Sequence, residues 1–196
     1  MPRTRKTADE RKREIVLTAI RLAGDIGPDR LTTQHLADAV GLSQPAIFRH
    51  FATKSAIWQA VGEHIAIALS AEKADTSIAS PADQLSDLVA KHLQSIARNP
   101  AIPAILFSRE LHVENEQLRQ HFERVMNIRR ARFASLFSQG IETGAFKPDL
   151  APTDAAALVL ATLQGIAMRW SLENKAFDLQ KEGSRLISCL IDGFKA

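Results

Sequence analysis

The sequence predicts an all-α fold. Apolar residues recur at intervals of three and four along most of the chain, and no window of alternating β-branched residues competes with them. The composition agrees, because 45% of the 196 residues are hydrophobic and 24% are charged, with only 9 Gly and 8 Pro. This balance is typical of a soluble, helix-rich globular protein whose length suffices for a large core.

Four helices are expected in the first part of the chain, at about 9–26, 33–40, 44–51 and 54–71. Gly27 and Pro28 end the first helix, and Gly41 separates the second from the third. The fourth presents an apolar stripe and is expected to bridge a small N-terminal module to the rest of the chain.

The later segments also follow helical spacing. Small and polar residues at 72–80 predict a loop, and Pro100 and Pro103 bracket a kinked or broken passage. Residues 144–152 are rich in turn-forming types. The helices expected here span about 81–98, 114–140, 153–172 and 178–194.

Cysteine content and hydropathy bear on the cellular setting. Cys189 is the single cysteine, so it has no partner for an intrachain disulfide, and the chain opens without an apolar signal segment. No apolar run approaches the length expected of a membrane span. We therefore expect a cytoplasmic protein without membrane contact.

Positive charge is concentrated at the N-terminal end. Residues 1–60 carry ten Lys and Arg against six Asp and Glu, a balance of +4, whereas residues 61–196 carry fifteen against sixteen, a balance of −1. A basic module beside a near-neutral one favours a polyanionic partner for the first module only. The same charges are also compatible with an ordinary solvated surface.

The stretch from Leu31 to Phe51 carries the most informative pattern. Two short helices that cross steeply need a small residue where they touch, which Ala37 supplies, and a residue that tolerates the turn, which Gly41 supplies. Apolar residues occupy the positions between them: Leu36, Val40, Leu42 and Ile47. The pattern predicts a helix-turn-helix that binds DNA, although an ordinary helical hairpin with a glycine turn shares some of these features.

Capping residues support the DNA-binding interpretation. Thr32 or Thr33 can cap the first of the two helices, and Ser43 or Gln44 can cap the second, where Pro45 fits the first turn. Capping, turn and contact residues thus agree on one local structure.

Residues 9–65 resemble the DNA-binding module of the TetR family of bacterial transcriptional regulators. The most specific matches are Leu31-Thr32-Thr33, Leu36-Ala37, Val40-Gly41, Gln44-Pro45-Ala46-Ile47-Phe48-Arg49-His50 and Lys54. The resemblance implies a three-helix DNA-binding helix-turn-helix domain over 1–53, whose third helix lies in the major groove. It also implies a C-terminal helical domain for ligand binding and dimerisation over 54–196, with 54–71 as the bridging helix.

Three positions depart from the family pattern. Phe48 stands where the family usually has tyrosine, so its ring can only pack or contact a thymine methyl group. Ala23 replaces a common phenylalanine and is expected to thin the core of the module. Gln34 stands where the tetracycline repressor has arginine, so the base preference at this position should differ.

Gln44 and Arg49 are the expected base-reading residues, because their side chains match the major-groove edges of adenine and guanine. Thr33, Ser43 and Lys54 suit phosphate contacts, as does His50, although a histidine here can also pack. The complete set of expected DNA-binding residues is Thr32, Thr33, Gln34, Ser43, Gln44, Pro45, Ala46, Phe48, Arg49, His50 and Lys54.

Six basic residues precede or open the first helix: Arg3, Arg5, Lys6, Arg11, Lys12 and Arg13. They can track the DNA backbone or enter the minor groove. They can equally form a disordered, solubilising tail.

The last two expected helices carry faces suited to close packing. The first has small residues at Ala155, Ala156, Ala157, Val159, Ala161, Thr162, Gly165 and Ala167, and the second has an apolar stripe at Leu186, Ile187, Leu190, Ile191 and Phe194. The family implies that such a pair forms the four-helix interface of a homodimer, which requires a palindromic operator with half-sites about 34 Å apart. Alternatively, these faces close the core of a monomer.

A small-molecule effector is expected among the middle helices. The lining residues proposed for it, each also compatible with core packing, are Phe107, Met126, Arg129, Phe133, Gln164, Met168 and Trp170. This mixture favours a small hydrophobic or aromatic ligand. The family implies that ligand binding moves the fourth helix, changes the spacing of the recognition helices and releases the operator.

Other functions find less support in the sequence. His92, His112 and His121 lack the i, i+4 spacing of a helical metal site, so neither a metal nor another cofactor is expected. No nucleophile-and-base pattern or phosphate-binding glycine loop occurs, so an enzyme is not expected. We expect a nucleoid-associated, ligand-responsive repressor, and the second hypothesis is a TetR-like factor without an inducer, either architectural or controlled by a protein partner.

Overall fold

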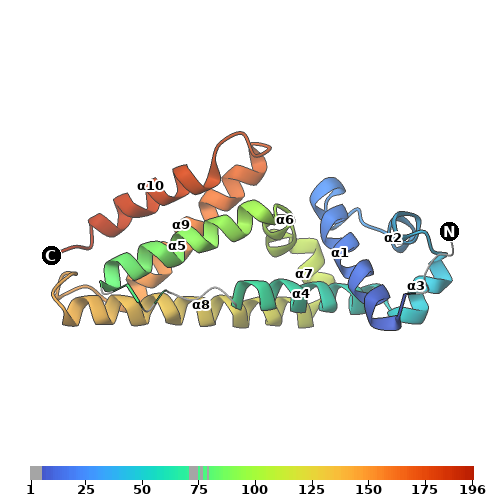
Figure 1. Ribbon diagram of the computed structural model, residues 1–196, viewed down its shortest axis with the longest axis horizontal. Helices are drawn as coiled ribbons and strands as arrows, with labels where there is room; N and C mark the ends of the chain where they lie inside the picture. Colours follow the sequence, from blue (N-terminus) through green and yellow to red (C-terminus); the bar gives the residue numbers. More distant parts are fainter. Residues whose placement is uncertain (1–5, 71–74, 76, 79) are drawn as a thin grey trace. The chain divides into compact units, whose positions relative to one another are not determined.

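The computed structural model describes residues 6–70, 75, 77, 78 and 80–196. Over these residues the chain is α-helical and contains no β-strand, apart from an isolated antiparallel bridge between Phe146 and Lys195 (Figure 1). The helices are α1 (Ala8–Ile26), α2 (Thr33–Val40), α3 (Gln44–His50), α4 (Lys54–Ser70), α5 (Pro81–Arg98), α6 (Ala101–Phe107), α7 (Arg109–Glu114), α8 (Glu116–Glu142), α9 (Pro152–Leu172) and α10 (Leu179–Asp192). The predicted all-α class is confirmed.

The chain divides into two compact units. The first contains the described residues up to Ile67 together with Ala104–Phe122, and the second contains Ala68–Pro103 and Glu123–Ala196. Helices α4, α6 and α8 therefore contribute residues to both units. The boundary expected between residues 53 and 54 separates two functions rather than two packing units, and it stays a prediction.

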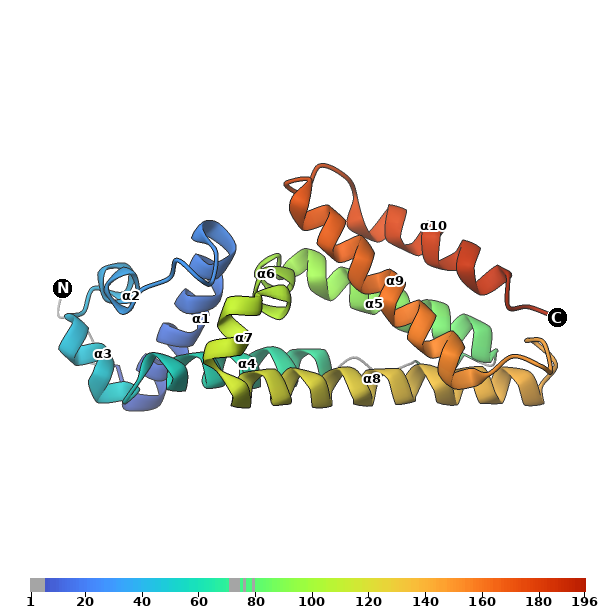
Figure 2. The same cartoon turned by 180° about the vertical axis from the view of Figure 1, so that it is seen from behind.

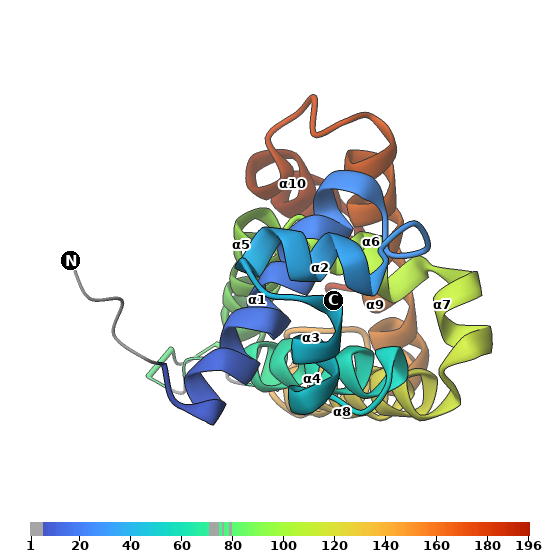
Figure 3. The ribbon, with the colours of Figure 1, turned by 90° about the vertical axis from the view of Figure 1, so that its right-hand side faces the viewer.

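In the first unit, α1 packs against both α2 and α3, and α2 packs against α3. The residues that these helices bury completely are Ile15, Ala19, Leu36, Ala37 and Ile47. Gly41 ends α2 with a φ of 67°, a left-handed conformation that glycine adopts without strain. Figures 1 and 3, drawn from directions at right angles, show that α2 and α3 cross steeply, as a helix-turn-helix requires.

Thr32 is the residue that caps α2. Its Oγ1 accepts a hydrogen bond from the His35 backbone N–H at 3.1 Å, and His35 Nδ1 accepts one in return from the Thr32 backbone N–H at 3.4 Å. Ser43 occupies the equivalent position before α3, but its side chain makes no capping hydrogen bond, which corrects the expectation. Pro45 in the first turn removes one of the two backbone donors that such a cap uses, and the Ala46 N–H donates instead to the Ser43 carbonyl at 2.9 Å.

In the second unit, α10 packs against α5 and α9 (Figure 2). Aromatic side chains fill much of the core, where the rings of Phe137 and Phe146 have centroids 5.0 Å apart and both are fully buried. Gly183 lets α10 approach α5 closely, because a Cβ atom there would lie 2.8 Å from both terminal methyl groups of Leu93. The largest side chains of this core therefore interlock around a few small residues.

The region between α5 and α8 departs most from the expected helix pattern. The broken passage at Pro100 and Pro103 is in fact the short helix α6, and α7 follows it where no helix was expected. Ser108 explains the break between them, because its side chain accepts a hydrogen bond from the Leu111 backbone N–H at 3.0 Å and caps α7. Of the loop expected at 72–80, only residues 75, 77, 78 and 80 are described, and the rest of that prediction lies outside the described residues.

Helix α9 corrects the expectation that no segment has the length and hydropathy of a membrane span. Its 21 residues include an 18-residue window with a mean hydropathy of 1.3, of which 44% is buried inside the protein. Eight of its residues, including Leu163 and Trp170, pack into the core of the second unit. A core helix rich in alanine and leucine meets the same criteria as a membrane span, so this helix is weak evidence for one.

The two helix starts within the helix-turn-helix lead to a matched prediction. Thr32→Ala should lower the free energy of unfolding by about 1 kcal/mol, because it removes the only side-chain acceptor that Thr32 offers to the start of α2. Ser43→Ala should change it by less than about 0.5 kcal/mol, since no capping bond is lost. Urea unfolding followed by circular dichroism measures both, and equal losses would contradict the assigned caps.

Candidate DNA-binding surface and effector region

Helix α3 separates its residues cleanly into a core side and an outer side. Ala46 and Ile47 are buried against the other helices of the module, whereas Gln44, Phe48 and Arg49 are exposed. Phe48 retains 41% of its surface exposure, which is unusual for a large apolar side chain. The exposed face thus carries both expected base-reading residues and an aromatic ring, and Ala46 presents no side chain to the outside.

Thr33 and Gln44 are joined across the turn. Gln44 Nε2 donates a hydrogen bond to Thr33 Oγ1 at 2.5 Å, and the Thr33 side chain is buried. Because an amide nitrogen carries two hydrogens, Gln44 keeps one N–H and its carbonyl oxygen for another partner. This geometry gives Thr33 an orienting role toward Gln44, which the sequence pattern did not reveal.

Cationic side chains lie at the end of α3 and the start of α4. Arg49 and His50 occupy the last turn of α3, and Lys54 is the first residue of α4. Within the described part of the chain, none of these three takes part in an ion pair. Gln34, by contrast, donates to Asp38 Oδ1 at 2.7 Å on the exposed surface of α2.

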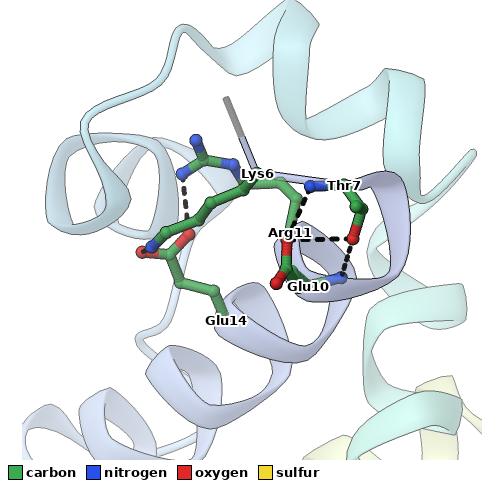
Figure 4. Close-up of polar contacts among 5 residues, drawn as sticks. All are labelled: Lys6, Thr7, Glu10, Arg11 and Glu14. Atoms are coloured by element: carbon green, nitrogen blue, oxygen red, sulfur yellow. Dashed lines mark hydrogen bonds and ion pairs between the residues drawn. The ribbon is translucent and has the colours of Figure 1, made fainter. Parts of the chain in front are cut away.

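Two of the basic residues near the N-terminus are paired with an acidic residue of α1 (Figure 4). Glu14 accepts a hydrogen bond from Lys6 Nζ at 2.7 Å and another from an Arg11 guanidinium nitrogen at 2.6 Å. The hydrogen bond from Lys6, together with the nearby charge of Arg11, lowers the pKa of the Glu14 carboxyl. Lys12 and Arg13 are exposed, and Arg3 and Arg5 lie outside the described residues.

Most of the expected effector residues fall in the second unit. Six of them, all except Phe107, belong to it, and Phe107 ends α6 in the first unit. Phe133 is fully buried, and Trp170 is buried with its indole N–H donating to the Phe177 carbonyl at 3.0 Å. Gln164 Nε2 donates a hydrogen bond to the Met126 sulfur at 3.5 Å. These contacts show core packing at several of the positions.

Arg129 is the unusual member of this set. It is a buried arginine, with 5% of its surface exposed. Its guanidinium donates to the Leu69 carbonyl at 3.1 Å in the last turn of α4 and is hydrogen-bonded to His92 Nδ1 of α5. Sequence reasoning missed His92 as its partner, although a histidine between Leu88, Val89 and Leu93 on an apolar helix face was the available signal.

The three histidines weighed as metal ligands have separate surroundings. His92 contacts Arg129 in the second unit, whereas His112 and His121 lie in the first unit. His112 is hydrogen-bonded through Nε2 to the Leu106 carbonyl at 2.9 Å, and both rings pack edge-on against Phe122. Among the described residues, no three His, Cys, Asp or Glu side chains group together as a metal site would need.

The small residues of α9 divide between two faces. Ala155, Ala156, Val159 and Ala167 are buried in the core, whereas Ala157, Ala161 and Gly165 are exposed together with Leu158 and Leu172. On α10, Ile187 and Ile191 are buried and Leu186 and Leu190 are half-buried, as is Phe194 just beyond the end of the helix. Helix α9 therefore packs one face into the core and keeps apolar residues exposed on another, whereas the apolar stripe that begins on α10 packs against the core.

Comparison with known protein families covers nearly the whole chain. The family described as "Bacterial regulatory proteins, tetR family" matches residues 15–61. The family described as "YsiA-like protein, C-terminal region" matches residues 63–193. The first match covers the helix-turn-helix, and the second covers more than half of the chain.

Individual relatives agree with these matches. The nucleoid occlusion factor SlmA of Haemophilus influenzae (strain PittGG) is 27% identical over 128 residues, which span 62% of this chain but only 59% of that protein. A TetR transcription regulator from Haloarcula marismortui ATCC 43049 has a TM-score of 0.81 at 20% identity, covering 96% of this chain and 100% of the other. The regulator FadR from Bacillus subtilis, in complex with stearoyl-CoA, has a TM-score of 0.74 at 18% identity, covering 93% and 98%. The helical fold and both family matches agree, and the chain belongs to the TetR family of bacterial regulatory proteins.

Proposed function

We propose that this TetR-family DNA-binding regulator is a homodimeric repressor, which reads a palindromic operator through α3 and is released from it by a small apolar ligand. The observation that carries the DNA-reading part is the outer face of α3, where Gln44 and Arg49 are exposed while their neighbours Ala46 and Ile47 are buried. The matched families consist of regulatory proteins rather than enzymes.

The roles of the DNA-facing residues follow from their chemistry. Arg49 offers a planar fork of donors that fits the two acceptors of guanine, and Gln44 retains the donor and acceptor that adenine requires. Lys54 is a flexible point charge at the start of α4, better suited to a phosphate. We therefore assign sequence reading to Gln44 and Arg49 and sequence-independent affinity to Lys54 and His50.

The exposed face of α9 supports a dimer. An added Cβ atom at Gly165 would meet no described atom of the protomer within 4 Å beyond the helix's own backbone, and Leu158, seven residues earlier on α9, is 51% exposed. Small residues on an apolar helix face allow a second helix to approach closely. A twofold pair of protomers would present two copies of α3 to the two halves of a palindrome.

A small molecule with an apolar part is our proposal for the effector, and an acyl chain is the example that we test. FadR, which shares the fold, was crystallised with stearoyl-CoA, and the second unit of this chain combines Met126, Phe133 and Met168 with the buried cation of Arg129. Apolar walls with a few polar groups are the usual composition of a ligand site. Arg129 also holds the last turn of α4, so a ligand that disturbs it would act on the helix that follows the DNA-binding module.

A second candidate function is a DNA-binding factor without a small-molecule inducer, architectural or controlled by a protein partner. The similarity to the nucleoid occlusion factor SlmA favours it. It predicts DNA binding that no ligand weakens.

Selection of bound sequences from random duplex DNA, at a stated salt concentration, tests the proposed function. The purified protein should recover a palindromic consensus.

Arg49→Ala should lose about 1–3 kcal/mol of discrimination at one base pair, because it loses the donors that match guanine. Lys54→Ala should weaken all sequences alike and reduce the slope of log K against log salt by about 1. Recovery of no consensus would reject operator reading, and identical profiles for the two variants would reject the division of roles.

Gly165→Leu tests the dimer face. A Cβ atom at this position would meet no described atom of its own protomer beyond the α9 backbone, so we expect unchanged helical content while the dimer dissociates and operator affinity falls at least tenfold. Circular dichroism measures the helical content, sedimentation measures the dimer, and titration of the operator duplex measures the affinity. Ala90→Leu, at an exposed position of α5, is the control for adding the same side chain elsewhere and should leave the dimer intact.

Stearoyl-CoA is the probe for the effector. It should raise the melting temperature of the protein and release the selected operator, because only the folded protein binds it. Coenzyme A without the acyl chain is the matched control, which separates the apolar part of the probe from its nucleotide. Equal effects of the two compounds would contradict an apolar site, and the absence of release by either would favour the factor without an inducer.

A further inference from the structure

Glu14 pairs with Lys6 and Arg11 at the basic N-terminal end of α1, and we call these three residues the Glu14 clamp (Figure 4). Both carboxylate oxygens of Glu14 are occupied, since Oε1 accepts from Lys6 Nζ at 2.7 Å and Oε2 accepts from Arg11 at 2.6 Å. Glu14 retains 28% of its side-chain exposure, Lys6 47% and Arg11 18%. One glutamate thus pairs with two of the cations that make this end of the chain basic.

The local fold holds the clamp in place. Thr7 caps α1, with its backbone N–H donating to Glu10 Oε2 at 2.7 Å and its Oγ1 accepting from the Glu10 N–H at 3.2 Å. This reciprocal pair sets the direction in which the chain enters the helix. Lys6 therefore lies beside the helix and reaches Glu14, eight residues further along the sequence.

Lys6 and Arg11 differ from the cations at the end of α3 and the start of α4 in having an acidic partner. Arg49 and Lys54 have no acidic partner among the described residues, whereas Lys6 and Arg11 share one. Phosphate contacts supply most of the sequence-independent affinity of a DNA-binding protein, and each contact adds about 0.9 to the salt slope. A cation held by a carboxylate contributes less to that affinity than a free one.

We infer that Glu14 is a specificity-determining residue, which keeps Lys6 and Arg11 from DNA phosphates and so restricts binding to non-operator sequences. The inference rests on the proposed DNA-binding function. Base reading by Gln44 and Arg49 is unaffected by the clamp, because these side chains contact base edges rather than the phosphates that Lys6 and Arg11 would reach. Release of the clamp therefore strengthens binding to any sequence and lowers the ratio of operator affinity to general affinity.

Water reaches all three side chains of these ion pairs, so the pairs are weak and are screened by salt. A DNA phosphate can therefore compete with Glu14 for the same cations. The hydrogen bond from Lys6 lowers the pKa of the Glu14 carboxyl, which favours the charged form that pairs with the two cations.

Glu14→Gln is the decisive variant, because glutamine keeps the size and helix preference of glutamate while removing the charge. Its control is Asp9→Asn, which removes the same charge five residues away, where no ion pair is formed among the described residues. On a 30-base-pair duplex of arbitrary sequence, Glu14→Gln should bind about tenfold more tightly than the wild type at low salt and steepen the salt slope by about 1 to 2. Asp9→Asn should change this affinity by less than about threefold.

Two further measurements complete the test. Adding Lys6→Ala and Arg11→Ala to Glu14→Gln should return the salt slope to the wild-type value or below it. Elution from immobilised heparin, a polyanion without base pairs, should need more salt for Glu14→Gln than for Asp9→Asn. This readout does not depend on operator recognition, so failure to select an operator would reject the proposed function while the heparin result still decides the clamp. Equal shifts for the two variants, in heparin elution and duplex binding, would overturn the inference.

Discussion

The DNA-binding module depends on burial against α1. Helices α2 and α3 have eight and seven residues, lengths at which an isolated helix is unstable in water. Ile15 and Ala19 of α1 are fully buried in the same unit as Leu36 and Ile47, so packing holds the two short helices. Because Ala46 and Ile47 face the core, the helical period turns Gln44, Phe48 and Arg49 outward, so the exposed surface of α3 follows from the apolar contact beneath it.

Each unit contains buried polar groups whose hydrogen bonds restrict how its helices pack. The Thr33 hydroxyl is buried and therefore needs a partner, which Gln44 supplies across the turn. In the second unit the buried guanidinium of Arg129 is hydrogen-bonded to a carbonyl at the end of α4 and to His92 of α5. Unpaired groups of this kind would be costly in the interior, so these bonds restrict which helix arrangements are stable.

Charge is used differently at the two ends of the DNA-binding module. The count of ten Lys and Arg over 1–60 overstates the number of unpaired cations, because Glu14 pairs with both Lys6 and Arg11. The cations at the end of α3 and the start of α4 have no such partner among the described residues. Position relative to acidic neighbours, rather than net charge, thus distinguishes the cations available to a polyanion.

The sequence by itself determined the helix class, the positions of most helices, the helix-turn-helix and the family, because these depend on periodicity and on residues near one another in the chain. Only the tertiary structure decided which residues of those helices are available. Thr33 and Ala46, expected at the DNA, are buried, and small residues of α9 expected on one surface divide between core and exterior. The bonds from Gln44 to Thr33 and from Arg129 to His92 join residues 11 and 37 positions apart. Such pairs form only when particular helix faces meet, and a single helix's pattern states which face is apolar but not which partner covers it.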